Sequence, residues 1–194
     1  MDTENNNLTA QQSLDIITSM IRQVKGNISY NSFYFLLWGW TIVIANLGVF
    51  IMIRFTDIKN PTMIFMITII SAIISIVYSA RKSKTIQTKT VLDSVNMWLW
   101  IGYGITCFTI VAFGNKTNWQ INPIVITMGS VPTFATGIML RFKPLVFGGV
   151  ALWLFGIVLF LLPSDLQFLI AAIAITIGYL VPGYMLKKSD ADVS

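Results

Sequence analysis

The chain has no histidine and a single cysteine, Cys107, among its 194 residues. Without histidine it cannot form a Ser–His catalytic arrangement or a His–Glu metal motif. One cysteine also leaves no intramolecular disulfide and no transition-metal site of ordinary composition. Cys107 lies in an apolar segment, where its simplest interpretation is a small buried residue. We therefore expect no catalytic residues, no cofactor and no metal.

Charged residues are scarce as well, at 11% of the chain, whereas soluble domains contain roughly 25%. None of the eight acidic residues falls at the centre of a long apolar segment. Proton pumps and ion-coupled transporters normally keep an ionisable group at such a position. Phosphate-binding glycine loops are missing too. The sequence therefore predicts a protein that is not an enzyme.

Apolar residues make up 55% of the chain and occur in long blocks. A bilayer core of about 30 Å requires roughly 20 apolar residues per helix. Six blocks reach that length: 33–53, 62–80, 95–113, 121–140, 144–162 and 166–186. They lack the polar face of soluble helices and the alternation of β-barrel strands. The sequence predicts an all-α, polytopic membrane bundle with six transmembrane helices, which occupies residues 33–186.

Lysine and arginine are distributed unevenly between the predicted loops. Ten fall on one side, namely Arg22, Lys25, Arg81, Lys82, Lys84, Lys89, Arg141, Lys143, Lys187 and Lys188, and only Arg54, Lys59 and Lys116 on the other. The positive-inside rule places both termini, with the tail 187–194, in the cytoplasm. No cleavable signal peptide is predicted, because the first 30 residues are polar.

The basic run at 81–89 predicts contact with anionic lipid headgroups. Binding of a cytoplasmic partner or of nucleic acid is the alternative for that run. The formal net charge of +5 follows from membrane topology. We expect membrane lipid as a partner and no direct nucleic acid binding.

Residues 9–28 predict a cytoplasmic amphipathic helix that follows a disordered tail, 1–8. Thr9 and Gln12 have capping-box spacing, and Gly26 is the predicted stop. One apolar stripe contains Leu14, Ile17, Ile21 and Val24. An isolated helix of this length is marginal in water, so the stripe must be buried. It either covers the headgroup layer or the bundle, or binds a partner protein or a second copy.

The six blocks pair into three helical hairpins that begin and end in the cytoplasm. Two dipeptides recur at an offset of 62 residues, Leu37-Trp38 with Leu99-Trp100 and Asn60-Pro61 with Asn122-Pro123. The third hairpin is a degenerate copy. Parallel repeats of this kind occur in some transporters. The alternative is that aromatic belts and outer turns recur in any polytopic protein.

Six polar side chains are predicted near mid-depth of the spans: Asn46, Ser71, Thr106, Ser130, Thr133 and Thr176. They form a candidate central polar layer. Membrane helices associate through small residues and weak hydrogen bonds, so packing is one interpretation of this layer. A ligand or ion pathway is the other.

The fourth block contains Pro132, which deprives the carbonyl of Met128 of its helical partner. Such a defect survives in a membrane only when it is buried in protein or faces a water-filled cavity. We expect this helix to be broken or kinked near Pro132, to contact at least three other spans and to turn Ser130 or Thr133 towards the core. A hydroxyl of Ser130, Thr133 or Thr136 would then bind the freed carbonyl.

The stretches "SLDIITSMI", "NSFYFLLWGW" and "GYLVPGYMLKK" resemble a group of small bacterial six-span membrane proteins of unknown function. The resemblance implies a bacterial cytoplasmic (inner) membrane protein and supplies no catalytic residues. The leading hypothesis is a non-catalytic sensor or regulator that binds a cytoplasmic protein, or itself, through the stripe Leu14, Ile17, Ile21 and Val24. The alternative is a small transporter or channel that uses the polar layer around the fourth span.

Overall fold

The computed structural model describes residues 10–83 and 91–191, with side chains for 32–81 and 91–189. Within these ranges the protein is all-helical, without strands. Six helical segments are long and apolar enough to cross a membrane: Ser32–Phe55, Pro61–Arg81, Val91–Ala112, Ile121–Met139, Lys143–Phe160 and Ser164–Ser189. The all-α fold with six apolar helices is thereby confirmed, and it suggests a multi-pass membrane protein.

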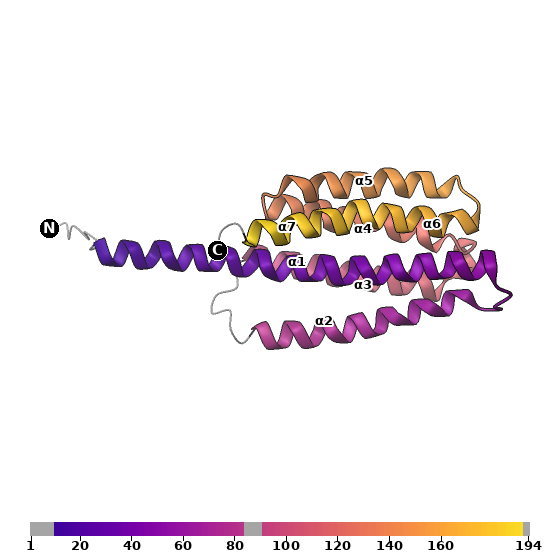
Figure 1. Ribbon diagram of the computed structural model, residues 1–194, viewed down its shortest axis with the longest axis horizontal. Coiled ribbons are helices and arrows are strands. Elements are labelled where there is room, and N and C mark those ends of the chain that lie inside the picture. Colours follow the sequence, from indigo (N-terminus) through magenta and orange to yellow (C-terminus); the bar gives the residue numbers. More distant parts are fainter. Residues whose placement is uncertain (1–9, 84–90, 192–194) are drawn as a thin grey trace.

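The first span belongs to a longer helix, α1 (Ala10–Phe55), which extends beyond the other helices at one end (Figure 1). A separate N-terminal helix is not confirmed, because α1 continues through Gly26, where we expected a stop. A single glycine costs only about 1 kcal/mol relative to alanine inside a helix, so it weakens a helix without ending it. Residues 1–8 and the side chains of Leu14, Ile17, Ile21 and Val24 lie outside the described residues.

Two of the spans combine different helical forms. The second consists of a 3-10 helix, η1 (Pro61–Met66), followed by α2 (Ile67–Ser83). The sixth consists of α6 (Ser164–Ile175), one π-helical turn, η3 (Thr176–Leu180), and α7 (Val181–Ala191). Because α7 runs to Ala191, the described part of the predicted C-terminal tail is helical.

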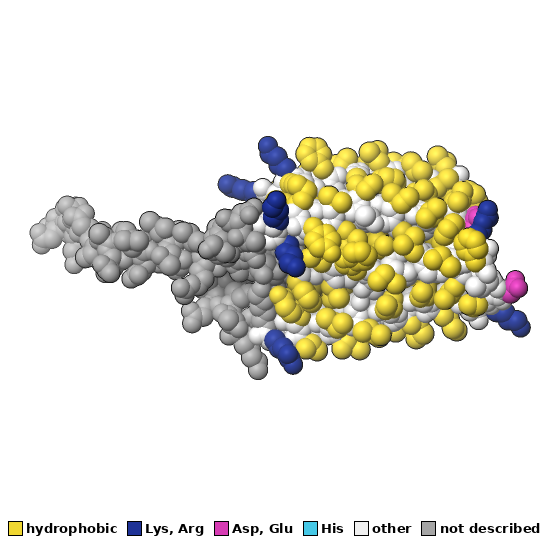
Figure 2. All heavy atoms as spheres, viewed as in Figure 1, with side chains coloured by type: hydrophobic (Ala, Val, Ile, Leu, Met, Phe, Trp, Pro, Cys, Tyr) yellow, Lys and Arg dark blue, Asp and Glu magenta, His cyan; other side chains and the backbone are white. Residues whose placement is uncertain are grey.

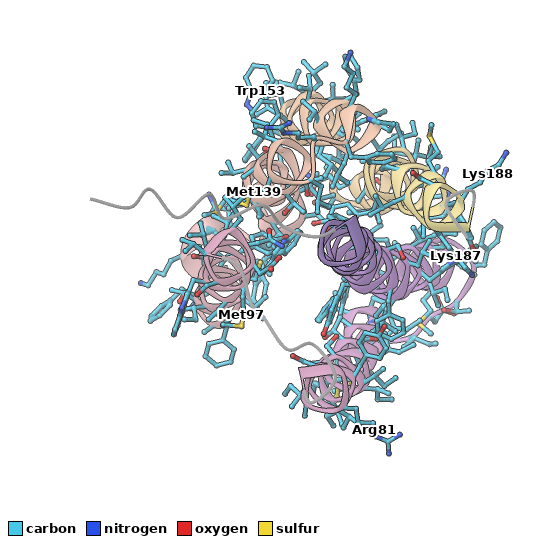
Figure 3. All side chains as sticks on the ribbon, turned by 90° about the vertical axis from the view of Figure 1, so that its left-hand side faces the viewer. Arg81, Met97, Met139, Trp153, Lys187 and Lys188 are labelled. Atoms are coloured by element: carbon cyan, nitrogen blue, oxygen red, sulfur yellow. The ribbon has the colours of Figure 1, made fainter. Side chains whose placement is uncertain are left out.

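The remaining spans are α3 (Val91–Ala112), α4 (Ile121–Met139) and α5 (Lys143–Phe160), with a 3-10 turn, η2 (Gly114–Thr117), between α3 and α4. Seen along the bundle, α1 lies near the centre, whereas α2 and α3 lie at the periphery (Figure 3). The most extensive packing joins α4 to α5 and α1 to α6. The three-hairpin arrangement is therefore not confirmed, because these pairs join helices that we assigned to different hairpins.

The buried residues lie mainly in the central helices, and the peripheral helices α2 and α3 contribute few. No residue of α3 is buried, and Ser71 is the one buried residue in the part of α2 whose side chains are described, 67–81. The core contains three leucines of α5 seven residues apart, Leu145, Leu152 and Leu159, which have almost no exposed surface. That spacing keeps one face of α5 against its neighbours. The wide apolar surface of the bundle (Figure 2) is what lipid chains would contact.

The charged side chains lie at the two ends of the bundle (Figure 2). One end carries Arg81, Arg141, Lys143, Lys187 and Lys188, and the other carries Arg54, Lys59 and Lys116. The two groups of basic residues are separated because they lie at helix ends that the order of the helices places at opposite ends of the bundle. We call the first group of residues the basic end.

The fourth span matches part of our expectation. α4 packs against α3, α5 and α6, and Pro132, Ser130 and Thr133 are buried, so its contacts and its orientation are confirmed. We predicted a break or a kink near Pro132. The helix is continuous from Ile121 to Met139, so a break at Pro132 is wrong, and a kink there stays a prediction.

The expected partner for the freed carbonyl is also wrong. Ser130, Thr133 and Thr136 donate to the carbonyls of Thr127, Gly129 and Pro132. A hydroxyl in a helix reaches the carbonyl three or four residues earlier. The carbonyl of Met128 would therefore need a hydroxyl at position 131 or 132, where the chain has valine and proline.

Candidate functional site

The six residues of the predicted polar layer occupy different environments. Asn46, Ser71, Ser130 and Thr133 are buried, whereas Thr106 and Thr176 are half-buried. Five of them bind a carbonyl of their own helix: Asn46, Thr106, Ser130, Thr133 and Thr176. All six are described, and no hydrogen bond joins any two of them. The sequence therefore located buried polar groups, but the structure does not connect them into one layer.

Asn46 nevertheless links two spans. Its side-chain nitrogen donates to the carbonyl of Ile42, at 2.9 Å, and its oxygen accepts from the side-chain nitrogen of Asn122, at 2.9 Å. Asn46 has no exposed surface. The pair joins α1 to the start of α4. From the sequence, Asn122 was noted only as part of the recurring Asn-Pro dipeptide. Sequence reasoning missed this contact because the partners are 76 residues apart.

A second link joins α3 to α4 through the hydroxyl of Thr136, which has no exposed surface. It accepts a hydrogen bond from the indole nitrogen of Trp100, at 3.1 Å. It also lies 2.6 Å from the side-chain oxygen of Asn96 and 2.7 Å from the carbonyl of Pro132. A hydroxyl has one hydrogen, so it donates to one of these two oxygens at a time.

Aromatic rings fill the space between α1, α3 and the last span. The ring of Trp100 lies edge-on to those of Phe35, Tyr103 and Tyr179, with centroids 5.8 to 6.1 Å apart. Such edge-to-face pairs stabilise beyond the area that they bury. The hydroxyl of Tyr103 donates to the carbonyl of Val125, at 3.1 Å. This cluster attaches the peripheral α3 to the core.

At the end opposite the basic end, Gln167 of α6 is buried. Its nitrogen donates to the side-chain oxygen of Gln120 and to the carbonyl of Leu162, at 2.9 and 3.0 Å. On the surface near it, Arg54 and Asp165 form an ion pair of 3.3 Å between α1 and α6. Both contacts hold helix ends together.

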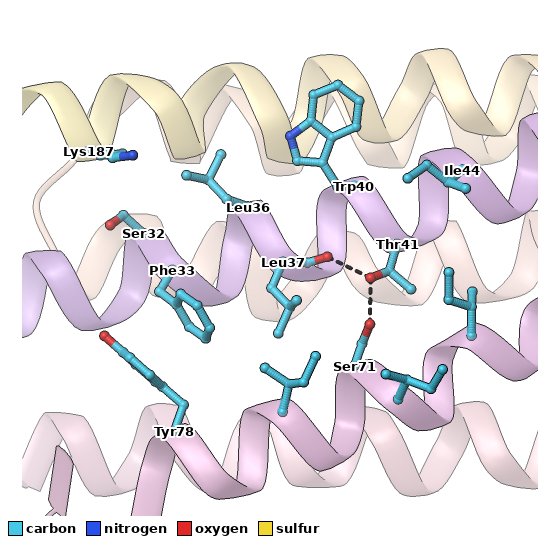
Figure 4. Close-up of a pocket in the computed structure, with 13 residues that line it drawn as sticks. Ser32, Phe33, Leu36, Leu37, Trp40, Thr41, Ile44, Ser71, Tyr78 and Lys187 are labelled. Carbon is cyan, nitrogen blue, oxygen red and sulfur yellow. Dashed lines mark hydrogen bonds between the residues drawn. The ribbon is translucent and has the colours of Figure 1, made fainter. Parts of the chain in front are cut away.

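A groove of about 740 Å³ runs along α1 between α2 and α7 (Figure 4). Its apolar walls come from α1 and α2, and Lys187 of α7 lies at the same end of the groove as Ser32 and Tyr78. Small-molecule sites have volumes of about 300–1,000 Å³. Of the residues that line this groove, only Ser71 was proposed from the sequence as a site residue. The groove itself could not be predicted, since only the fold brings α7 to α1.

The chemistry available to these sites is limited. Every buried side-chain nitrogen and oxygen in the described part of the protein has a hydrogen-bond partner. No group of three His, Cys, Asp or Glu side chains converges within residues 32–81 and 91–189. These arrangements suit packing and the binding of an apolar molecule.

Comparison with known proteins adds no assignment. No protein-family model, no curated protein and no solved structure matches the chain significantly.

Proposed function

We propose that the protein is a non-catalytic regulatory module of a membrane, to which a cytoplasmic partner binds through the N-terminal part of α1. One observation carries the proposal, namely the continuity of this helix. α1 has 46 residues, and the span Ser32–Phe55 takes 24 of them, which leaves 22 residues in front of it. At 1.5 Å per residue, these 22 residues extend about 33 Å from the span.

A continuous helix couples what happens at its two ends. The span of α1 packs against α2, α6 and α7. A partner that tilts the N-terminal part of α1 therefore also strains these contacts. A flexible linker at residues 26–32 would not transmit such a tilt. The apolar stripe Leu14, Ile17, Ile21 and Val24 gives the partner a surface of helical spacing.

The transporter or channel hypothesis has less support. A pathway needs polar atoms that are available to a passing solute or ion, and the buried hydroxyls of the bundle already donate within it. Among the residues whose side chains are described, no Asp, Glu, Lys or Arg is buried. Ion-coupled transport normally requires such a group.

The proposal includes the orientation and the membrane. The excess of lysine and arginine at the basic end favours a cytoplasmic N-terminus and C-terminus, and the resemblance noted above favours a bacterial inner membrane. The proposed hairpin repeat is supported by two similar contacts. The indole of Trp38 donates to the hydroxyl of Ser75, and that of Trp100 donates to the hydroxyl of Thr136, both at 3.1 Å.

The test uses the full chain with Ile17→Ser and Ile21→Ser, compared with a control pair on the opposite face, Asp15→Ser and Ser19→Ala. The proteins bound to each variant after chemical cross-linking in cells are measured by quantitative mass spectrometry, and the melting temperature of each purified variant is recorded. We expect the stripe variant to lose its partners and keep its melting temperature, while the control keeps both. A stripe variant with an unchanged set of partners contradicts the proposal.

A second variant tests the coupling itself. A Gly-Ser-Gly-Ser insertion after Gly26 keeps the stripe but interrupts the helix. In the unaltered chain we expect partner binding to change the rate at which a protease cleaves between α2 and α3. In the insertion variant we expect the partner to remain bound without changing that rate. If binding still changes the cleavage between α2 and α3, the continuity of α1 is not the cause.

A further inference from the structure

Beyond regulation through α1, the groove between α1, α2 and α7 has the features of a lipid site. Its lining is mostly apolar, with Leu36, Leu37 and Ile44 from α1 and Ile67, Ile70 and Ile74 from α2. Its inner polar atoms are already bound. The hydroxyls of Thr41 and Ser71 lie 2.6 Å apart, and that of Thr41 donates to the carbonyl of Leu37, at 2.8 Å (Figure 4). A polar solute would find no free partner there, whereas an apolar chain needs none.

The two ends of the groove differ. Lys187, Ser32 and Tyr78 lie at the basic end, and Ile44 lies at the far end (Figure 4). Lys187 is exposed, and Lys188 and Arg81 also lie at this end of the bundle (Figure 3). A cation at the mouth of an apolar groove complements an anionic headgroup that carries an acyl chain.

The length of the groove fits one leaflet. Twelve residues separate Ser32 from Ile44, which corresponds to about 18 Å along a helix. A bilayer core is about 30 Å thick, so one leaflet accounts for about 15 Å. The groove therefore begins at headgroup level and ends near the middle of the membrane.

We propose that this groove binds an acyl chain of an anionic phospholipid from the leaflet at the basic end, with Lys187 at its phosphate. The ring of Phe33 stacks on that of Tyr78, with centroids 3.9 Å apart, and closes the gap between α1 and α2 near the headgroup. On the other side, Trp40 donates to the hydroxyl of Tyr184, at 3.0 Å, and joins α1 to α7. The two contacts define the walls of the site.

The experiment uses the full chain in dodecyl maltoside micelles, with palmitoyl-oleoyl phosphatidylglycerol as the anionic probe and the phosphatidylcholine of the same chains as its match. Native mass spectrometry measures the bound fraction of each lipid. We expect an affinity about fivefold higher for the anionic lipid, because one lysine near an anionic headgroup strengthens binding by about this factor. Lys187→Gln should remove that preference, and Lys188→Gln, whose side chain does not line the groove, should keep it.

Filling the groove tests the acyl chain separately. Ile74 lines the groove and is 41% exposed, while Ile73 beside it is 57% exposed and does not line it. Ile74→Trp should lower the bound fraction of both lipids, and Ile73→Trp should not. Ile70→Trp is a second filling variant in case Ile74→Trp does not fold.

The inference is overturned by any of three results. The first is equal affinity of the unaltered protein for the two lipids. The second is an equal effect of Lys187→Gln and Lys188→Gln. The third is full binding of both lipids by a folded groove-filling variant, which would place the lipid elsewhere on the bundle or at a contact between copies of the chain.

Discussion

The indole nitrogen of Trp100 donates to the hydroxyl of Thr136, at 3.1 Å, across the interface of α3 and α4. Trp38 lies 62 residues earlier and donates to Ser75 across the interface of α1 and α2. Each contact joins a peripheral helix, α3 or α2, to a neighbouring helix.

Thr136→Val should destabilise the bundle. The change keeps the volume but removes the acceptor for Trp100 and the donor for Pro132 or Asn96. Interhelical hydrogen bonds in membranes contribute about 0.6 kcal/mol on average and at most about 1.7, so we expect a loss of about 1 kcal/mol. Unfolding by sodium dodecyl sulfate in mixed micelles measures it.

The matched control is Thr106→Val on α3, because Thr106 is half-buried and its hydroxyl binds only the carbonyl of Gly102. Its free energy of unfolding should stay within about 0.5 kcal/mol of the unaltered protein. Equal values for Thr136→Val and Thr106→Val would show that the Trp100 contact contributes nothing to stability.

The second prediction concerns the energetic coupling between Asn46 and Asn122. Asn122→Leu leaves the oxygen of the fully buried Asn46 without its partner, so we expect a loss of about 1–3 kcal/mol. Replacing both residues by leucine should cost less than Asn122→Leu alone, because no buried polar group is then left unpaired. A double-mutant cycle of unfolding free energies measures the coupling, and additive effects would contradict it.

The sequence was sufficient for the helices because their signal is local. Each span is long, apolar on average and almost free of charge, and the burial of Ser130 and Thr133 followed from the rule that Pro132 must avoid lipid. The continuity of α1 was missed because a glycine and polar residues at 26–32 resemble a linker. Whether a helix continues across them depends on the sum of many small contributions to its free energy.

The pairing of helices could not be deduced in the same way. Which span packs on which depends on shape, above all on where two backbones approach closely. Gln167 and Gln120 meet from segments 47 residues apart, and no local pattern marks them as partners. The groove has the same origin, since Lys187 joins it only through the packing of α7 on α1.

The orientation in the membrane gives a third prediction. In a Cys107→Ala background, Asn60→Cys and Asn118→Cys should react in whole cells with a thiol reagent that does not cross membranes. Thr85→Cys and Asp190→Cys should react only after the cells are permeabilised, because the positive-inside rule places them in the cytoplasm. Labelling at position 85 in intact cells would reverse the proposed topology.

The last prediction concerns the most extensive interface, between α4 and α5. A Cβ atom added at Gly149 would lie 2.7 Å from the backbone nitrogen of Phe134 and 2.8 Å from its Cα. Backbone atoms cannot turn away as a side chain does, so Gly149→Ala must push the two helices apart. Overpacking of this kind costs about 1–3 kcal/mol.

The control is Gly104→Ala on α3, where an added Cβ meets nothing within 4 Å. Since alanine favours a helix over glycine by about 1 kcal/mol, Gly104→Ala should be neutral or stabilising. The two variants should therefore shift the melting temperature of the purified protein in opposite directions or differ by several degrees, with Gly149→Ala the lower. If Gly149→Ala melted at or above Gly104→Ala, the close approach of α4 and α5 would be wrong.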